Sequence, residues 1–361
     1  MQSRPYDSPT SHRPVTRFLG AGSAGKRALG ILSMGCVLLG TGGCLGSDKT
    51  PELTDEEKVE LYSETASFLY EDSSFVRAQD QAVKVLEVDP ENLAMRRMIG
   101  WIRLRSGAPR DLDIAEDFFR RLVRDGDDHA ATIQGLATVC ERLGLGYEET
   151  ARSYESGGRE APEGEDITAL VEETHEMALQ YWHESETLYL STLTEGEGST
   201  RSKNGLQRVY AYLGKYDESL AMVDQVLSEA RGELEQWRRM LTNSDLGEQD
   251  EILMRTNEKA AIALLRNTHL FAADLLFQQN RYADALGNVE SAVMLDSTDA
   301  ELYSLRAQLR SKTGDFAGAI EDIDVYLRRS ETPLDHPDVR RAFDLRTECE
   351  LALARTADSG R

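Results

Sequence analysis

A short phrase occurs twice near the carboxyl end of the chain, and the two copies are 34 residues apart. Tyr282-Ala283-Asp284-Ala285-Leu286 returns as Phe316-Ala317-Gly318-Ala319-Ile320. Gly314 precedes the second copy and can adopt the positive φ that ends a helix. A period of 34 residues is the length of one helix–turn–helix unit. The repeat therefore predicts a chain of helical hairpins that stack side by side.

Ala285 and Ala319 each begin an apolar helix face. Val289 and Ala292 lie four and seven residues after Ala285, and the same offsets after Ala319 also carry apolar side chains. Alanine leaves room for a second helix backbone to approach. This pattern resembles the tetratricopeptide repeat (TPR) family. The resemblance implies a solenoid whose first helices line a concave groove that binds protein segments.

Length and charge narrow the fold class and the partners. A chain of 361 residues exceeds one ordinary compact core, and alternating β-branched runs are absent from its sequence. We expect an all-α, TPR-type helical-hairpin solenoid with an inserted long helix and a projecting helical hairpin. The formal net charge of −23 argues against binding to nucleic acid and to an anionic membrane face.

The 34-residue period divides most of the chain into units. Ala78, Ala82 and Val85 mark the second helix of the first unit, and Gly144 falls at the expected turn of the third. Residues 166–195 hold no Gly or Pro for a mid-repeat turn, so we interpret them as an inserted helix. The expected divisions are a signal peptide (1–43), a tether (44–57), units one to three (58–164), an inserted helix and loop (165–199), units four to six with extended helices at 230–265 (200–333), and a capping helix and tail (334–361). A degenerate repeat folded back onto the solenoid is the alternative for the extended helices.

The amino terminus has the pattern of an export signal. Residues 1–27 are polar and basic, an apolar run from Ala28 to Gly40 follows, and Gly42-Gly43 precede Cys44. Small residues before a Cys resemble the lipobox of bacterial lipoproteins, which implies lipidation of Cys44. Cys36 is the rival position, and an uncleaved signal-anchor is the other alternative. Leu45 after the Cys resembles outer-membrane rather than inner-membrane lipoproteins, so we expect the periplasmic side of the envelope.

Sequence patterns typical of catalysis are weak. His175 and His183 are eight residues apart, about 12 Å in helical rise, which is too far for one metal ion. Gly-rich phosphate loops and nucleophile motifs do not occur in the sequence. Cys140 and Cys349 lack zinc spacing and are expected to be small apolar fillers. We therefore expect no enzyme, no cofactor and no bound metal.

The groove offsets of the family place cationic and aromatic residues on the expected inner wall. These predicted partner-binding residues are Arg97, Trp101, Arg105, Gln134, Arg142, Arg201, Asn204, Arg208, Tyr212, Gln308 and Lys312. Arg and aromatic residues often dominate interface energies, and Arg grips carboxylates in bidentate fashion. The alternative is an ordinary solvated helix face in which Trp101 serves packing. The wall lacks the Lys and Asn pattern of chaperone-binding TPR domains, so chaperone-tail recognition is not implied.

These expectations combine into one functional hypothesis. We expect an exported, lipid-anchored TPR scaffold or adaptor that binds protein or peptide segments of acidic character at the cell envelope. A solute- or metal-binding envelope lipoprotein is the alternative, followed by an enzyme. Similar lipoproteins take part in type IV pilus biogenesis or outer-membrane protein assembly, and the sequence has no motif that chooses between these processes.

Overall fold

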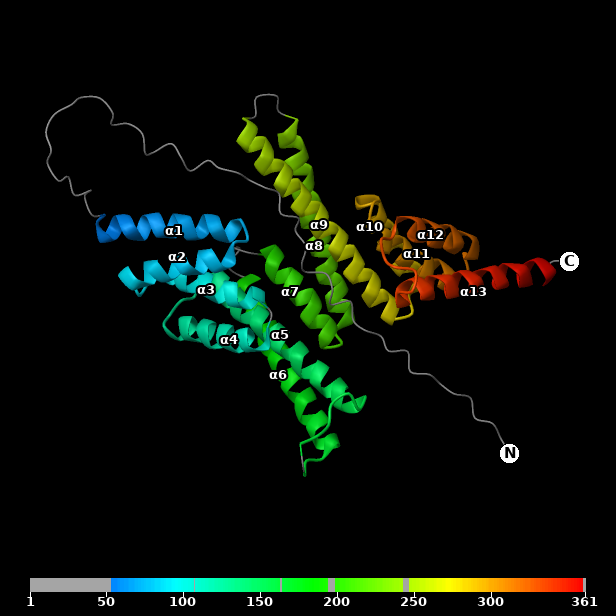
Figure 1. Cartoon of the computed structure of the whole chain (residues 1–361), viewed down its shortest axis with the longest axis horizontal. Helices are drawn as coiled ribbons and strands as arrows, with labels where there is room; N and C mark the ends of the chain where they lie inside the picture. The colour runs from blue at the N-terminus through cyan, green and yellow to red at the C-terminus, as the bar shows by residue number, and fades with distance from the viewer. Residues whose placement is uncertain (1–52, 107, 163, 194–198, 243–246, 360–361) are drawn as a thin grey trace. The chain divides into compact units, whose positions relative to one another are not determined.

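The computed structural model describes residues 53–361, apart from 107, 163, 194–198, 243–246 and 360–361. Within these residues every regular element is an α-helix (Figure 1). The helices are α1 (Asp55–Glu71), α2 (Phe75–Val88), α3 (Leu93–Ser106), α4 (Pro109–Arg124), α5 (Ala130–Glu155), α6 (Ile167–Leu193), α7 (Ser199–Tyr212), α8 (Tyr216–Leu241), α9 (Glu248–Gln278), α10 (Tyr282–Leu295), α11 (Ala300–Thr313), α12 (Phe316–Arg329) and α13 (Pro337–Ser359).

Each helix packs against the helix that follows it in the chain. The hairpins are α1/α2, α3/α4, α5/α6, α7/α8, α9/α10 and α11/α12, and α13 lies against α12. The first helices α3, α5 and α7 also contact one another, α3 with α5 and α5 with α7. This arrangement confirms the expected all-α, TPR-like solenoid of helical hairpins.

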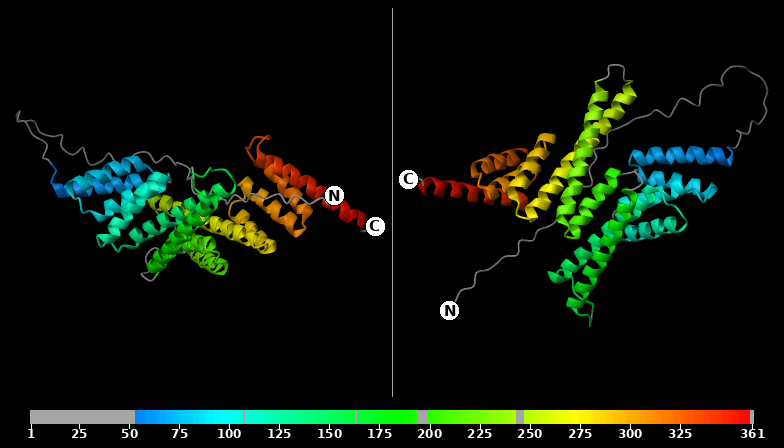
Figure 2. Two further views of the ribbon diagram at one scale, coloured as in Figure 1. Left: turned by 90° about the horizontal axis from the view of Figure 1, so that it is seen from below. Right: turned by 180° about the vertical axis from the view of Figure 1, so that it is seen from behind.

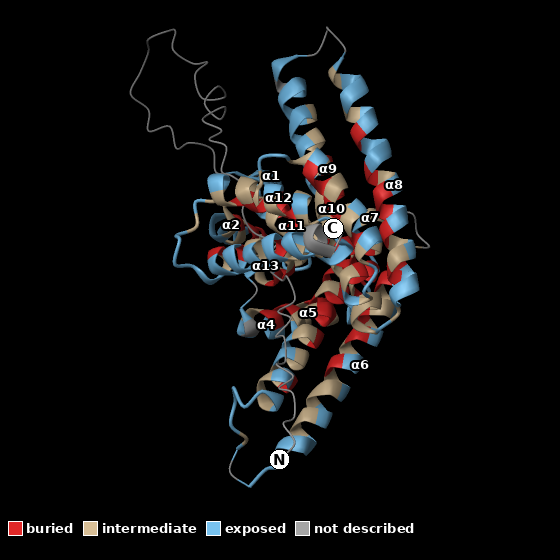
Figure 3. Cartoon of the chain, turned by 90° about the vertical axis from the view of Figure 1, so that its right-hand side faces the viewer, coloured by how far each residue is buried: buried red, intermediate tan, exposed pale blue. Residues whose placement is uncertain are grey.

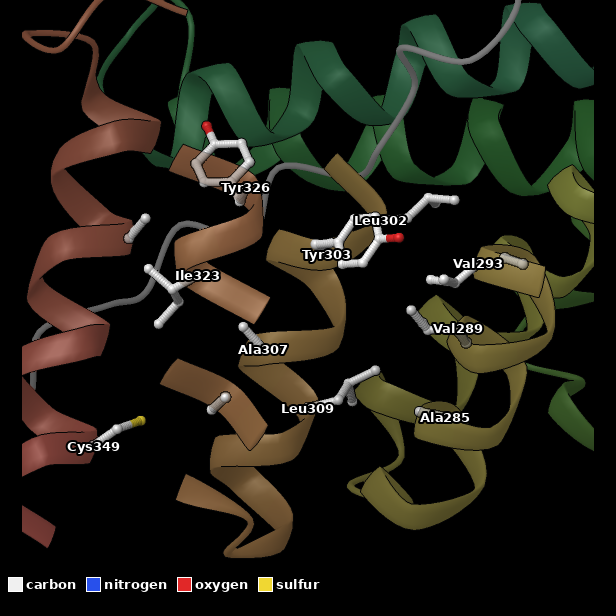
Figure 4. Packing of buried hydrophobic residues seen from close by; sticks show 14 of the residues in the cluster. Ala285, Val289, Val293, Leu302, Tyr303, Ala307, Leu309, Ile323, Tyr326 and Cys349 are labelled. Atoms are coloured by element: carbon white, nitrogen blue, oxygen red, sulfur yellow. The ribbon is translucent and has the colours of Figure 1, made fainter. Parts of the chain in front are cut away.

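The repeated phrase begins two helices, and its residues Ala285 and Ala319 are buried as predicted. Ala285 and Ala319 have no exposed surface, and Val289 and Ile323 are 1% exposed. These residues belong to one apolar cluster with side chains of α11 and α13, and Figure 4 shows Ala285, Val289 and Ile323 within it. Gly314 has φ of 87° and ends α11 in the left-handed conformation. The apolar spacing therefore becomes one shared core of the last two hairpins and the final helix.

The two helices predicted for the third unit are wrong. The period placed a turn at Gly144, but α5 runs through this residue without interruption, and its partner is α6. A Cβ on Gly144 would collide with the indole of Trp182, so this glycine serves close contact between two helices. The segment interpreted as an insertion, residues 165–199, thus supplies the second helix of the third hairpin. Residues 55–57, assigned to the tether, form the first turn of α1.

The extended helices of the fourth and fifth hairpins are α8 and α9. These two helices pack against each other as a long antiparallel pair, and Figure 2 shows them in yellow-green and yellow. Near the carboxyl end of α8 and the amino end of α9 the side chains are mostly exposed, and burial begins at Leu234 and Ala261 (Figure 3). Within the described residues, one helical segment, Asp250–Gln278, is long and apolar enough to span a membrane. Its apolar window has mean hydropathy 1.3 and is 44% buried in the protein.

Cys140 and Cys349 are buried free thiols that pack among apolar side chains, as expected. Burial raises the pKa of the Cys140 thiol, so this side chain stays a neutral filler. The predicted signal peptide and the lipidation site Cys44 lie outside the described residues.

Candidate functional site: a cationic hollow between α1, α3 and α7

Nine of the eleven predicted groove residues lie on α3, α5 and α7, the three first helices that contact one another. Gln308 and Lys312 lie on α11 and are exposed there. The wall expected from the family offsets is therefore assembled from three consecutive hairpins in its central part. What each side chain does on that wall differs from residue to residue.

Several of the predicted residues connect helices instead of facing solvent. The Arg208 guanidinium donates to both carboxylate oxygens of Glu141 at 2.6 and 2.9 Å, which joins α7 to α5. Burial by itself would lower the pKa of Arg208, but the Glu141 carboxylate holds that pKa above its usual range. The Tyr189 hydroxyl donates to the same carboxylate, so α6 joins the network. Arg208 is therefore a structural residue of the wall.

Gln134 and Arg142 on α5 have a similar connecting role. The buried Gln134 amide donates to the hydroxyl of Ser202 on α7 at 3.0 Å. The Arg142 guanidinium donates to the carbonyl oxygen of Leu104 on α3 at 2.6 Å, and burial lowers the pKa of Arg142. These bonds hold the three first helices in register.

Arg97 is paired with a buried carboxylate. Its guanidinium donates to Asp127 at 3.0 and 3.1 Å, and Thr132 donates to the same carboxylate at 2.6 Å. Although burial would raise the pKa of Asp127, these hydrogen bonds hold that pKa below its usual range. Arg97 is thus fixed in position at the edge of the surface.

Four predicted residues meet in one hollow. The surface between α1, α3 and α7 encloses about 250 Å³. We call it the cationic hollow, and its lining residues are Tyr70, Ala94, Arg97, Met98, Trp101, Arg105 and Arg201. Residues from three helices converge here, and three of the seven carry a guanidinium. A cationic surface of this kind contrasts with the net charge of −23 for the chain.

Arg105 and Arg201 lie over aromatic rings in this hollow. The Arg201 guanidinium is 5.0 Å from the Trp101 ring, and the Arg105 guanidinium is 5.2 Å from the Tyr70 ring. Trp101 itself is anchored because its indole N–H donates to the carbonyl oxygen of Ala131 at 3.2 Å. Both guanidiniums are exposed, and neither forms an ion pair with any carboxylate in the described part of the chain. Their hydrogen-bonding edges remain available to a ligand.

The remaining predicted residues lie away from the hollow. The Tyr212 ring stacks on Trp182 with centroids 5.2 Å apart, and burial raises the pKa of its hydroxyl. The Asn204 side-chain oxygen accepts a hydrogen bond from Gln207 on the same helix. Tyr212 and Asn204 thus serve packing and local structure in this wall.

The first hairpin carries none of the predicted groove residues, yet its helix α1 contributes Tyr70 to the cationic hollow and lines a second hollow. This acidic hollow, of about 600 Å³, lies between α1 and α3 and is lined by Ser63, Glu64, Ser67, Phe68, Glu71, Asn92, Ala94 and Met95. Ser63, Ser67 and Glu71 lie one 34-residue period before Arg97, Trp101 and Arg105. The same offsets therefore indicate this second surface.

The chemistry of the cationic hollow is that of anion binding. A guanidinium offers N–H donors in a planar fork that matches a carboxylate. A guanidinium that already lies on an aromatic ring has fewer orientations in the free protein, so it loses less conformational freedom when a ligand binds. Among the described residues, His, Cys, Asp and Glu form no group of three that could hold a metal ion. The site is thus suited to recognition of a charged segment.

Comparison with protein-family models finds no match, and comparison with curated proteins finds none either. Solved structures of several TPR proteins are similar to this chain. A thermophilic TPR protein of Thermus thermophilus shares 14% identity, with 71% of this chain and 98% of that chain covered and a TM-score of 0.42. The Pseudomonas aeruginosa protein pilF shares 16% identity over 80% of this chain and 97% of that chain, with a TM-score of 0.44.

A TPR protein of Parabacteroides merdae shares 18% identity over 80% of this chain and 99% of that chain, with a TM-score of 0.35. The fold is a TPR-like solenoid. That description rests on the consecutive hairpins and on the buried small residues at the 34-residue period.

Proposed function

We propose that this TPR-like solenoid is a protein-binding scaffold that takes acidic segments of its partners in the cationic hollow. The observation that carries the proposal is the pair of exposed guanidiniums, Arg105 and Arg201. Each is held over an aromatic ring, and neither has a carboxylate partner within the described residues.

The surrounding charge favours this assignment. In a chain with 64 acidic and 41 basic residues, the other predicted arginines of the wall have internal partners: Arg97 pairs with Asp127, Arg208 pairs with Glu141, and Arg142 donates to the carbonyl oxygen of Leu104. Arg105 and Arg201 are left without such a partner among the described residues, and with Trp101 they form the combination of Arg and aromatic residues that dominates many protein interfaces. Each charge-assisted hydrogen bond contributes about 1.5–3 kcal/mol.

The second part of the proposal concerns location. We propose export and lipid anchoring at Cys44, with the solenoid on the periplasmic side and the outer membrane as the supporting bilayer. Support comes from the sequence alone, because a basic stretch, a short apolar run and Gly42-Gly43 precede the Cys. Two or more acyl chains hold a protein stably on a bilayer, so partner binding would take place beside the membrane.

The binding proposal is tested by in-cell crosslinking and mass spectrometry on the full chain. The double variant Arg105→Glu with Arg201→Glu should reduce partner capture about tenfold or more, because it replaces two favourable charge contacts by repulsion. Arg77→Glu, at an exposed position of α2 outside the hollow, is the matched control and should leave capture unchanged. Equal capture by all three proteins would refute the proposed function.

The anchor is tested separately by fractionating cells that express the Cys44→Ala variant. We expect the wild-type protein in the outer-membrane fraction and the variant in the soluble or inner-membrane fraction as an unprocessed precursor. Identical fractionation of the two proteins would contradict lipidation at Cys44. The Cys36→Ala variant is the control, and it should fractionate as the wild type does.

A further inference from the structure

The cationic hollow and the acidic hollow adjoin each other. Ala94 of α3 lines both, and both lie between α1 and α3. Tyr70 of α1 lines one and the next residue, Glu71, lines the other. A segment that lies along α3 and fills the first hollow therefore passes directly into the second.

The two hollows carry opposite charge. Glu64 and Glu71 are exposed in the acidic hollow, and neither forms an ion pair with a cation anywhere in the part of the chain that the structure describes. Arg105 and Arg201 in the cationic hollow are likewise exposed and form no ion pair with a described carboxylate. The other arginines of α3 are paired, Arg96 with Glu91, Arg97 with Asp127 and Arg103 with Asp111. Within the two hollows, the unpaired charges are thus separated by sign.

An apolar side chain lies among the carboxylates of the acidic hollow. Phe68 is 52% exposed and lines this hollow beside Met95, which is 4% exposed. An exposed phenylalanine in a surface depression favours contact with an apolar group. The surface therefore offers an anion site, an apolar contact and a cation site.

The two hollows lie close together on α1. The Tyr70 ring lies 5.2 Å from the Arg105 guanidinium, and Glu71 is the next residue of α1. An acidic and a basic side chain of one short segment can therefore reach the two hollows.

We propose that the partner segment is dipolar: an extended peptide with a carboxylate in the cationic hollow, a Lys or Arg in the acidic hollow, and an apolar side chain against Phe68. This inference rests on the proposed function and adds a second charge and an apolar contact to it. Segments that are acidic throughout are then poor ligands because Glu64 and Glu71 repel them.

The test is selection of peptides from a phage-displayed random library on the full chain. Enriched peptides should carry one acidic and one basic residue at a consistent spacing and in a consistent order, with an apolar residue close to the basic one. Enrichment of peptides that are acidic only would overturn the inference and leave the proposed function standing. Selection without enrichment of acidic residues would overturn both.

Charge-reversal variants then measure the contribution of each hollow to peptide binding. For the best enriched peptide, labelled with a fluorophore, Glu64→Lys with Glu71→Lys should weaken binding at least about tenfold by fluorescence polarisation. A peptide in which the basic residue is replaced by Glu should regain affinity for that variant. Glu87→Lys on α2, exposed and outside both hollows, is the control for an added positive charge.

The outcomes of this comparison are distinct. Weaker binding by the Glu64 and Glu71 variant, with recovery by the charge-reversed peptide, supports a dipolar ligand. Unchanged binding by that variant, together with loss of binding by Arg105→Glu, contradicts the dipolar ligand and retains the acidic one. Circular dichroism of each variant confirms that the exposed substitutions leave the helices folded.

Discussion

Arg208 and Glu141 form a largely buried ion pair of the central wall. The side chain of Glu141 is 5% exposed and that of Arg208 is 27% exposed. Removing one partner of a buried pair leaves an uncompensated charge and costs about 3–5 kcal/mol. Arg208→Met should therefore lower the free energy of unfolding by about that amount, as measured by urea denaturation.

A second variant separates the charge from the packing. Arg208→Met combined with Glu141→Leu removes both charges, so it should recover a large part of the loss. If the double variant is no more stable than Arg208→Met, the loss arises from packing and not from an unpaired carboxylate.

A single buried residue, His269, makes the free energy of unfolding depend on pH. It is 6% exposed, its Nδ1 lies 2.9 Å from the Asn288 side-chain oxygen and its Nε2 lies 3.4 Å from the Arg231 guanidinium. Burial, followed by the Arg231 charge, lowers the pKa of His269 below its ordinary value of 6.5, against the raising effect of Asn288. The folded protein thus favours the neutral ring, while the unfolded chain takes up a proton below about pH 6.5.

The free energy of unfolding should accordingly fall as pH decreases from 7 toward about 5, before the carboxylates titrate near pH 4. His269→Gln should flatten this decrease, because glutamine does not titrate. His183→Gln is the control, since the His183 side chain is 60% exposed, and it should keep the wild-type slope. Urea unfolding at a series of pH values measures both, and equal slopes for the two variants would contradict the assignment.

Among the elements, α8 and α9 combine a buried part with an exposed part. Leu227, Ala230 and Leu234 of α8 pack on Ala261 and Leu265 of α9, whereas the residues near the 243–246 connection are mostly exposed. Local opening requires little energy where few apolar contacts are broken.

Hydrogen exchange should therefore differ within the single helix α9. We expect the amides of residues 251–258 to exchange much faster than those of residues 265–276, which lie among buried side chains. Mass spectrometry of peptic fragments resolves the two parts. Uniform protection along α9 would show that the exposed ends are covered by another copy or a partner.

At the scale of the whole molecule, each hairpin depends on its neighbours, as is general for solenoids. The last helix α13 contributes Val339, Ala342 and Cys349 to the core that also holds Ile323 and Tyr326 of α12. Its removal exposes the apolar face of the last hairpin. Burial of one such side chain contributes about 1.5–3 kcal/mol.

Deletion of residues 334–361 should therefore lower Tm and cause aggregation, which differential scanning calorimetry and light scattering would detect. Leu351→Gln on the outer side of α13, where Leu351 is 54% exposed, should change stability by less than about 0.5 kcal/mol. A truncated chain that melts at the wild-type temperature would contradict a capping role for α13.

The sequence by itself determined the helical period, the small residues Ala285 and Ala319 at close contacts and the turn at Gly314, which has positive φ. These features depend on residues close together in the chain, because helix periodicity and glycine geometry are local. The cationic hollow could be predicted in part, since the offsets of one helix indicate which side chains share a face.

Only the tertiary structure decided which guanidiniums are free and which helices pair. Arg208 meets a carboxylate 67 residues away, and Arg97 meets one 30 residues away. Gly144 lies where the 34-residue period predicts a turn, yet it belongs to the continuous helix α5, where it lies close to the indole of Trp182. Such contacts join distant parts of the chain, so packing between helices, which no local pattern specifies, separates a binding side chain from a structural one.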